Sequence, residues 1–128
     1  MRIVAAIARY LLGLMFVVFG SNSFLHFIPM GPPQPGNAGI FINVLMAAHY
    51  FYAVGAVMVI SGLLLLIGRF VALGLTLLAP VLFNILLFHL CMAPSSIGMG
   101  LFATALWFLV FWQHRAAFGG LFQAKLPG

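Results

Sequence analysis

Charged side chains are almost absent from this sequence, and their positions divide it into long apolar stretches. No Lys, Arg, Asp or Glu occurs between Arg9 and Arg69, or between Arg69 and Arg115. Hydrophobic residues make up 66% of the 128 positions and charged residues 4%, against roughly 25% charged in soluble domains. Since a helix of about 20 apolar residues crosses the hydrocarbon core of a bilayer, the chain is predicted to be a membrane protein.

Four windows of membrane-spanning length lie between the polar breaks. They cover about residues 10–27, 44–67, 70–92 and 97–113, and residues 28–39 form a Pro/Gly-rich loop outside the bilayer. The apolar window of the second span already begins at Ile40, so its first turns are expected to tilt or to lie in the membrane interface. Because backbone amides in lipid must be bonded within the protein, residues 1–128 are predicted to form a single all-α membrane domain, an antiparallel bundle of four transmembrane helices.

The basic residues predict one orientation for this domain. They lie in the N-terminal segment, between the second and third spans, and in the C-terminal tail: Arg2, Arg9, Arg69, Arg115 and Lys125. Lys and Arg collect in the cytoplasmic segments of membrane proteins. Both termini are therefore predicted to face the cytoplasm, where the same cations are expected to contact anionic lipid.

The complete lack of Asp and Glu excludes several classes of function. Carboxylate pairs, Ser-His-Asp triads and protein cages for Ca²⁺ or Mg²⁺ all require acidic side chains. The net charge of +5 reflects missing acids rather than a basic surface, so no nucleic acid partner is expected. The sequence also contains no flavin or iron–sulfur motif. We therefore expect the chain not to be catalytic on its own.

Two polar side chains interrupt the third span, in the stretch NILLFHLCMAP. Asn84 lies near the middle of the span and His89 lies nearer to its outer end. Polar groups are costly in lipid and usually face the bundle interior or a cavity. We expect both residues to form hydrogen bonds between helices. The alternative is contact with a ligand, in which His89 hydrogen-bonds a quinone carbonyl and Asn84 orients the molecule.

Histidines near the predicted outer leaflet indicate a third kind of site. His26 ends the first span, His49 lies early in the second, and Met92 shares a helical face with His89. These four side chains are candidate ligands for copper or haem iron. Contact with lipid headgroups is the alternative for His26 and His49, and the paired spacings of zinc sites are absent. No cofactor is indicated by a clear motif, and quinone, copper and haem all remain open.

Small residues and a proline predict how the helices pack. Close backbone approach is expected in the second and third spans at four positions: Gly55, Ser61, Gly62 and Gly74. Pro80 is expected to loosen the third span and to free a carbonyl near position 76. The hydroxyl of Thr76 is then expected to help bond the backbone there.

Three stretches of the chain carry a resemblance to a known family: LLGLMFVVFGSNSFLHF, YFYAVGAVMVISGLLLLIGRF and GRFVALGLTLLAPVLFNILLFHL. Together they resemble the DoxX-like family of small four-helix bacterial membrane proteins. The resemblance covers nearly the whole chain. Its most specific part is the turn at residues 68–70 with the series that follows it: Pro80, Asn84 and His89.

The resemblance implies a multi-pass protein of the bacterial inner membrane with a link to membrane redox complexes. In the family pattern a Lys often occupies the position of Ser23, a Glu that of Met58, and an acidic residue falls near Trp107, whereas all three are uncharged here. This difference favours an accessory or structural subunit of a larger redox or energy-converting complex, with the lipid bilayer and other membrane subunits as partners. The alternatives are a quinone- or sulfur-linked oxidoreductase subunit and an outer-leaflet copper or haem binding protein.

Overall fold

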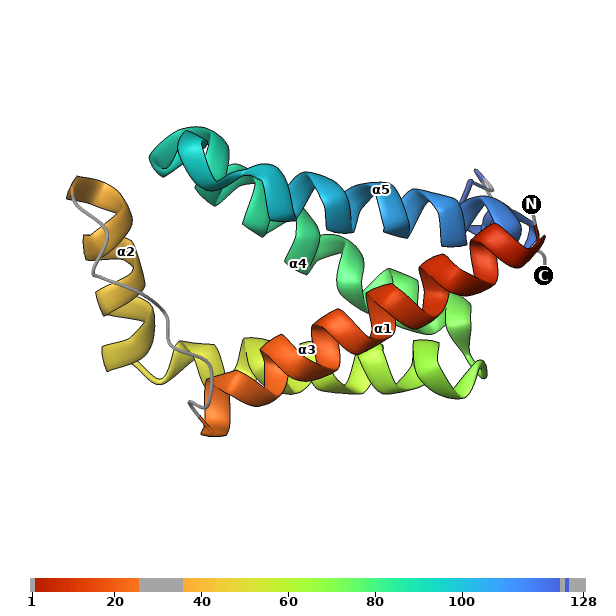
Figure 1. The fold of residues 1–128 in the computed structure, drawn as a ribbon, viewed down its shortest axis with the longest axis horizontal. Helices are drawn as coiled ribbons and strands as arrows, with labels where there is room; N and C mark the ends of the chain where they lie inside the picture. The colour runs from red at the N-terminus through yellow and green to blue at the C-terminus, as the bar shows by residue number, and fades with distance from the viewer. Residues whose placement is uncertain (1, 26–35, 123, 125–128) are drawn as a thin grey trace.

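The computed structural model describes residues 2–25, 36–122 and 124, and every regular element among them is a helix (Figure 1). Three helices, α1, α3 and α4, are long and apolar enough to cross a membrane. The all-helical, membrane-type character predicted for the chain is confirmed at this level. In chain order the elements are α1 (Arg2–Leu25), α2 (Gly36–Ala47), α3 (Tyr50–Ile67), α4 (Val71–Met92), η1 (Pro94–Ser96), α5 (Gly98–Gln113) and η2 (Arg115–Phe122), where η marks a 3₁₀ helix.

Four of the helices pack along one another. The largest contact is the one between α1 and α3. α3 also packs on α4, α4 packs on α5, and α5 packs on α1. In Figure 1 each of these helices runs in the opposite direction to the one before it, and α2 stands across their ends. α2 makes only small contacts, with α3 and α4.

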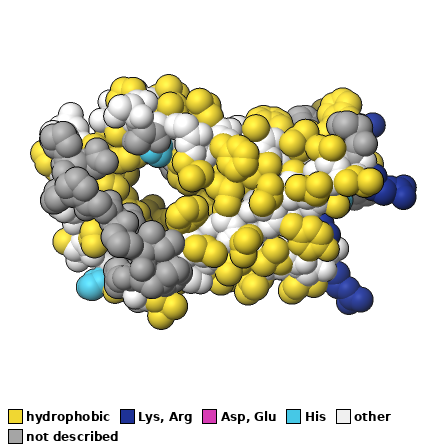
Figure 2. All heavy atoms as spheres, in the orientation of Figure 1, with side chains coloured by type: hydrophobic (Ala, Val, Ile, Leu, Met, Phe, Trp, Pro, Cys, Tyr) yellow, Lys and Arg dark blue, Asp and Glu magenta, His cyan; other side chains and the backbone are white. Residues whose placement is uncertain are grey.

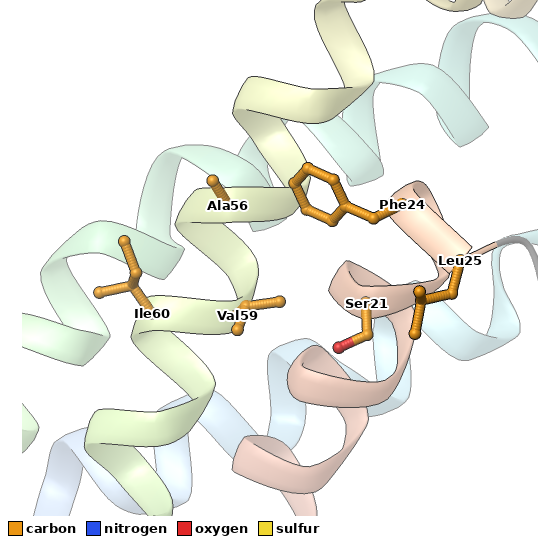
Figure 3. A pocket seen from close by; sticks show the side chains of 6 residues that line it. All are labelled: Ser21, Phe24, Leu25, Ala56, Val59 and Ile60. Atoms are coloured by element: carbon orange, nitrogen blue, oxygen red, sulfur yellow. The ribbon is translucent and has the colours of Figure 1, made fainter.

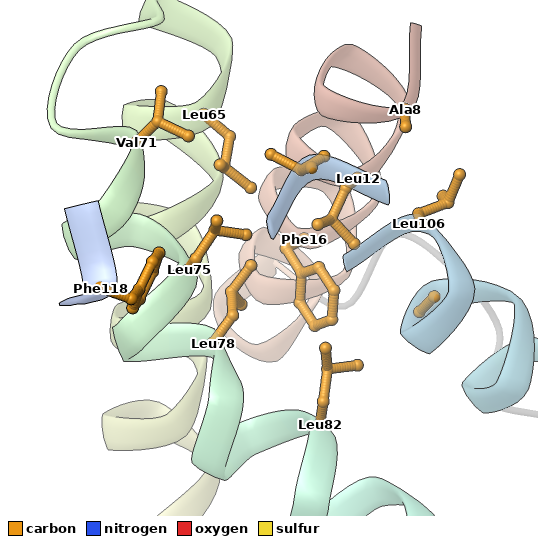
Figure 4. Close-up of a cluster of buried hydrophobic side chains, with 12 residues drawn as sticks. Ala8, Leu12, Phe16, Leu65, Val71, Leu75, Leu78, Leu82, Leu106 and Phe118 are labelled. Carbon is orange, nitrogen blue, oxygen red and sulfur yellow. The ribbon is translucent and has the colours of Figure 1, made fainter. Parts of the chain in front are cut away.

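The packed core lies at one end of this arrangement. Its side chains come from α1, α3, α4, α5 and η2, and they meet between these helices in Figure 4. In lipid such packing gains dispersion contacts rather than a large hydrophobic free energy. Fully buried examples are Leu12, Leu65, Leu75, Leu78 and Val110.

Glycines bring the backbones of α1 and α3 into contact. A Cβ atom on Gly62 would lie 2.6 Å from the carbonyl oxygen of Gly13, and one on Gly20 would lie 2.8 Å from that of Gly55. The two glycines of each helix are seven residues apart, about two turns, so they share a face. The predicted close approach at Gly55 and Gly62 is confirmed, whereas their partners on α1 were not foreseen.

The close approach predicted at Ser61 and Gly74 is also confirmed, and it lies between α3 and α4. Ser61 is fully buried, and its hydroxyl donates to the carbonyl of Val57 at 2.7 Å. A Cβ atom on Gly74 would lie 3.2 Å from the carbonyl oxygen of Ser61. Both small residues thus let α4 approach α3 closely.

α1 begins at Arg2, eight residues before the predicted start of the first span. The early turns are helical because Arg9 has partners inside the protein. Its Nη1 donates to the carbonyl of Leu65 in the last turn of α3, and its guanidinium carbon lies 4.4 Å from the centre of the Tyr10 ring. A cation at a helix C-terminus is favourable because the last carbonyls lack partners within the helix. Arg9 therefore joins two helices besides marking orientation.

The prediction that the second span, residues 44–67, is one continuous helix is wrong. α2 ends at Ala47 and α3 begins at Tyr50, and between them His49 has a left-handed backbone with φ of 58°. No Pro or Gly marks this break. Such a conformation costs about 1–2 kcal/mol in a non-glycine residue, which the contacts of α2 must offset. The first turns of the window do form a separate element that crosses the ends of the other helices (Figure 1).

The predicted loop at residues 28–39 is wrong at its end, because residues 36–39 belong to α2. The prolines of this segment all precede Gly36, so the following residues keep their amide donors and can form a helix. The rest of that loop, residues 28–35, lies outside the described residues. The other predicted spans, 70–92 and 97–113, agree with α4 and α5 to within one residue.

The basic side chains visible in Figure 2 gather at one end of the molecule. This is the end at which α1 begins and α5 ends (Figure 1). Arg9 is partly buried there, and Arg2, Arg69 and Arg115 are exposed. Lys125 lies outside the described residues. A single basic end is the arrangement that the predicted orientation requires.

Substitution of Gly62 by Ala should destabilise the packing of α1 on α3. The new methyl group would meet the backbone of Gly13, which cannot rotate away. We expect a loss of about 1–3 kcal/mol, as for other overpacked sites, measured as a lower midpoint of thermal unfolding by circular dichroism in detergent. Gly98→Ala is the matched control, because a Cβ atom there meets nothing within 4 Å. Equal midpoints for the two variants would contradict the close backbone contact.

Candidate ligand cavity

A cavity of about 730 Å³ lies at the end of the molecule opposite the packed core. α4 runs obliquely from α3 toward α5, so the helices separate toward this end (Figure 1). The space-filling view shows a hollow at this end of the molecule, with hydrophobic side chains along part of its border (Figure 2). Its walls come from the second half of α1, from α2, from the first half of α3 and from the second half of α4.

α2 closes one side of the cavity through aromatic contacts. The rings of Phe41 on α2 and Phe88 on α4 lie 5.6 Å apart between centres. At the start of α3, Tyr52 stacks on His49 at 5.5 Å and on Phe24 of α1 at 5.4 Å. Aromatic pairs at such distances stabilise beyond the area they bury. Rings from four helices lie on the lining of the cavity, and Phe24 supports them from outside it.

The cavity combines an apolar lining with a few polar groups. Small-molecule sites in proteins have this composition and a volume of about 300–1,000 Å³. Among the described residues, the polar side chains on the lining are Asn22, Ser23, His49, Tyr50, Tyr52, Asn84 and His89. The main apolar ones are Phe19, Phe41, Met46, Phe51, Met58, Val81 and Phe88.

Asn84 and His89 both face the cavity from α4. The lining residues of this helix recur at the spacing of one helical face, from Pro80 to His89. The prediction that Asn84 and His89 form hydrogen bonds to other helices is wrong among the described residues. Asn84 Nδ2 donates to the carbonyl of Pro80 at 3.0 Å, and His89 Nδ1 lies 2.8 Å from the carbonyl of Ile85, both within α4. A side chain on a helix readily reaches the carbonyl four residues earlier.

The contact of His89 assigns its two ring nitrogens. A carbonyl oxygen can only accept a hydrogen bond, so Nδ1 must carry the proton and donate to Ile85. In a neutral ring the other nitrogen, Nε2, is then an acceptor. Among the described residues, no hydrogen-bond partner of Nε2 is present. Every buried side-chain nitrogen or oxygen of these residues has a hydrogen bond, so Nε2 without a partner cannot be a buried atom. Nε2 is therefore accessible to a ligand.

The structure places the metal candidates only in part. His49 and His89 line the same cavity, whereas Met92 is not on the lining. His26 lies outside the described residues. Within residues 2–25, 36–122 and 124, no three His, Cys, Asp or Glu side chains come together in a way that could hold a metal ion.

Sequence reasoning did not identify several of the residues that line the cavity. Asn22 and Ser23 lie in the last turns of α1, where Asn22 is buried. Phe41 and Met46 belong to the helix that the loop prediction partly replaced. The usable signal was the proline-free apolar run after Pro35, which has the length of a short helix.

A second, smaller hollow of about 390 Å³ lies at the surface between α1 and α3. Figure 3 shows its six side chains, which come from these two helices. Ser21 supplies its polar group, and the other five residues are apolar: Phe24, Leu25, Ala56, Val59 and Ile60. With so few polar groups, this hollow lacks the means to orient a ligand.

Pro80 lies on the cavity lining, and the backbone next to it is bonded differently from the prediction. The hydroxyl of Thr76 donates to the carbonyl of Ala72 at 2.8 Å, one turn earlier than expected. The indole Nε1 of Trp107 on α5 donates to the carbonyl of Leu75 at 2.9 Å. This bond ties α5 to α4 in the turn before the proline, where the loss of an amide donor weakens the helix.

Comparisons of the chain with protein-family models, curated proteins and solved structures found no match. The resemblance to the DoxX-like family is therefore carried by the three sequence stretches alone.

Replacement of Trp107 by Phe should loosen the contact between α4 and α5. The variant keeps an aromatic ring but loses the donor to Leu75, at an expected cost of about 1 kcal/mol. The measurement is the free energy of unfolding in a mixed-detergent titration. Trp112→Phe is the control, because that ring is 57% exposed and contacts Arg115 at the surface. If both variants unfold at the same detergent ratio, the Trp107 hydrogen bond does not stabilise the turn before Pro80.

Proposed function

We propose that the chain is a four-span inner-membrane protein that binds a quinone-type molecule in the cavity, as a subunit of a larger redox complex. The cavity is the observation that carries this proposal. It offers an apolar space of about 730 Å³ with rings on its walls and a few polar groups. A quinone or hydroquinone has the matching chemistry, a flat apolar ring with two oxygens at opposite edges.

Four spans with both termini in the cytoplasm account for the charge distribution. The exposed arginines lie at one end, and α2 and the cavity lie at the other. α5 has 16 residues, about 24 Å of helix, which is shorter than an average hydrocarbon core. It packs along both α1 and α4, and η1 and η2 extend the chain at its ends. A bilayer can thin locally to match a short span.

The role of a subunit follows from what the chain lacks. Electron transfer to or from a quinone needs a redox centre, and the sequence has no motif for one. It also has no carboxylate to take up protons. A partner protein would supply both. The resemblance to the DoxX-like family, whose relatives are linked to membrane redox complexes, supports the same role.

Purified protein should bind a short-chain benzoquinone in detergent micelles. A variant that fills the cavity, Val54→Trp, should weaken binding about tenfold or more, because the indole takes up the space of the ligand ring. Leu101→Trp adds the same side chain at a position on α5 that is 53% exposed and not on the lining, so it should bind as wild type does. Equilibrium dialysis measures both. Wild-type protein that retains no quinone above empty micelles would remove the proposal.

The orientation can be tested with single cysteines in a Cys91→Ala background, since Cys91 is the one native cysteine. Ser95→Cys in η1 and Gly119→Cys in η2 both replace exposed residues. A membrane-impermeant maleimide should label position 95 in intact spheroplasts and position 119 only after permeabilisation. Labelling of position 119 in intact spheroplasts would reverse the proposed orientation.

A further inference from the structure

We propose that the cavity selects the reduced, hydroxyl-bearing form of its ligand, a hydroquinone or related phenol, over the oxidised quinone. The proposal rests on the proposed function, because it specifies which form of a quinone-type ligand the same cavity holds. It reverses the alternative role considered from the sequence, in which His89 donates a hydrogen bond to a quinone carbonyl. The preference depends on which nitrogen of His89 is available to the ligand.

The bond from Nδ1 to Ile85 leaves Nε2 as an acceptor in the neutral ring. A hydroquinone O–H can donate to that lone pair. A quinone carbonyl brings a second acceptor against it, so two lone pairs would face each other without a proton between them. In an apolar space, the loss of one hydrogen bond with both partners desolvated is costly.

A charged ring would remove this preference, because both nitrogens of an imidazolium donate. The chain has no carboxylate side chain that could pair with that charge. It contains no Asp or Glu, and the cavity lining is mostly aromatic and aliphatic. The preference for a hydroxyl is thus a property of the neutral ring.

The other polar groups of the lining do not discriminate between the two forms. Asn84 keeps its Oδ1 and a second N–H after donating to Pro80, so its amide can accept or donate. The hydroxyls of Ser23, Tyr50 and Tyr52 also serve either way. His49 is exposed, and no hydrogen bond to its ring is described, so either of its nitrogens can carry the proton. Among the described lining residues, only His89 has a ring whose donor and acceptor nitrogens are assigned by a hydrogen bond to the backbone.

The test compares three tetramethyl-substituted probes on purified protein in detergent under anaerobic conditions. The probes are the hydroquinone, the quinone, and the dimethyl ether of the hydroquinone, which keeps the ring and both oxygens but has no O–H. Isothermal titration calorimetry should give a dissociation constant about tenfold lower for the hydroquinone than for the other two. A lower constant for the quinone, or equal constants, overturns the preference but leaves quinone-type binding intact. Failure of all three probes to bind overturns the proposed function instead.

Two variants assign the preference to one ring. His89→Phe keeps an aromatic side chain but removes the acceptor, so the hydroquinone and its dimethyl ether should bind with constants equal to within about twofold. His114→Phe is the matched control, because His114 makes the same contact, Nδ1 to the carbonyl of Val110 at 3.0 Å, at a position outside the lining. It should keep the wild-type preference. A preference that survives in His89→Phe overturns the assignment to His89.

A measurement on wild-type protein covers the case in which His89→Phe does not fold. Nitrogen-15 NMR of histidine-labelled protein, assigned by comparison with His26→Phe, His49→Phe and His114→Phe, reports the tautomer of each ring. We expect the proton of His89 on Nδ1, and a shift of Nε2 when the hydroquinone is added but not when its dimethyl ether is added. A proton on Nε2 in the free protein would overturn the inference.

Discussion

The backbone contact between α1 and α3 determines how the other helices can be arranged. Paired glycines on these two helices leave no side chain between them at two levels, two turns apart. The pair therefore stays close along its length, whereas α4 begins against α3 and leans toward α5. Because lipid provides little hydrophobic driving force between helices, such backbone proximity supplies dispersion contacts that bulkier residues would prevent. The cavity lies where the leaning of α4 separates it from this pair.

Packing and charge divide the molecule into two ends with different properties. Toward the basic end, Leu12, Leu75 and Leu78 are fully buried, and Arg9 bonds the last turn of α3. Toward the other end the helices separate, and aromatic rings from α1, α2, α3 and α4 surround an open space. A rigid packed end can hold helices at fixed positions while the opposite end keeps room for a ligand. The cation that joins α1 to α3 is thus far from the groups that would meet the ligand.

The apolar windows and the small residues predicted much of the fold, because helix length and close packing in lipid depend on local composition. The break at His49 could not be predicted in this way, since Ala48 and His49 carry no helix-breaking signal and the break is compensated by contacts of α2 with distant residues. The inward direction of Asn84 and His89 followed from the cost of polar groups in lipid. Their partners did not, because a bond to the preceding turn and a bond to another helix satisfy the same polar group equally well. Membership of the DoxX-like family and the redox role stay predictions.

Hydrogen bonds within α4 explain how polar side chains can border a space without closing it. If Asn84 and His89 had bonded to α1 or α3, they would have held α4 against those helices at the level of the cavity. Bonded instead to the carbonyls of Pro80 and Ile85, each is partly satisfied without any neighbour. Each also keeps unused capacity, an amide oxygen and N–H on Asn84 and a lone pair on His89. A ligand then meets polar groups that are already oriented by the helix, which lowers the cost of ordering them on binding.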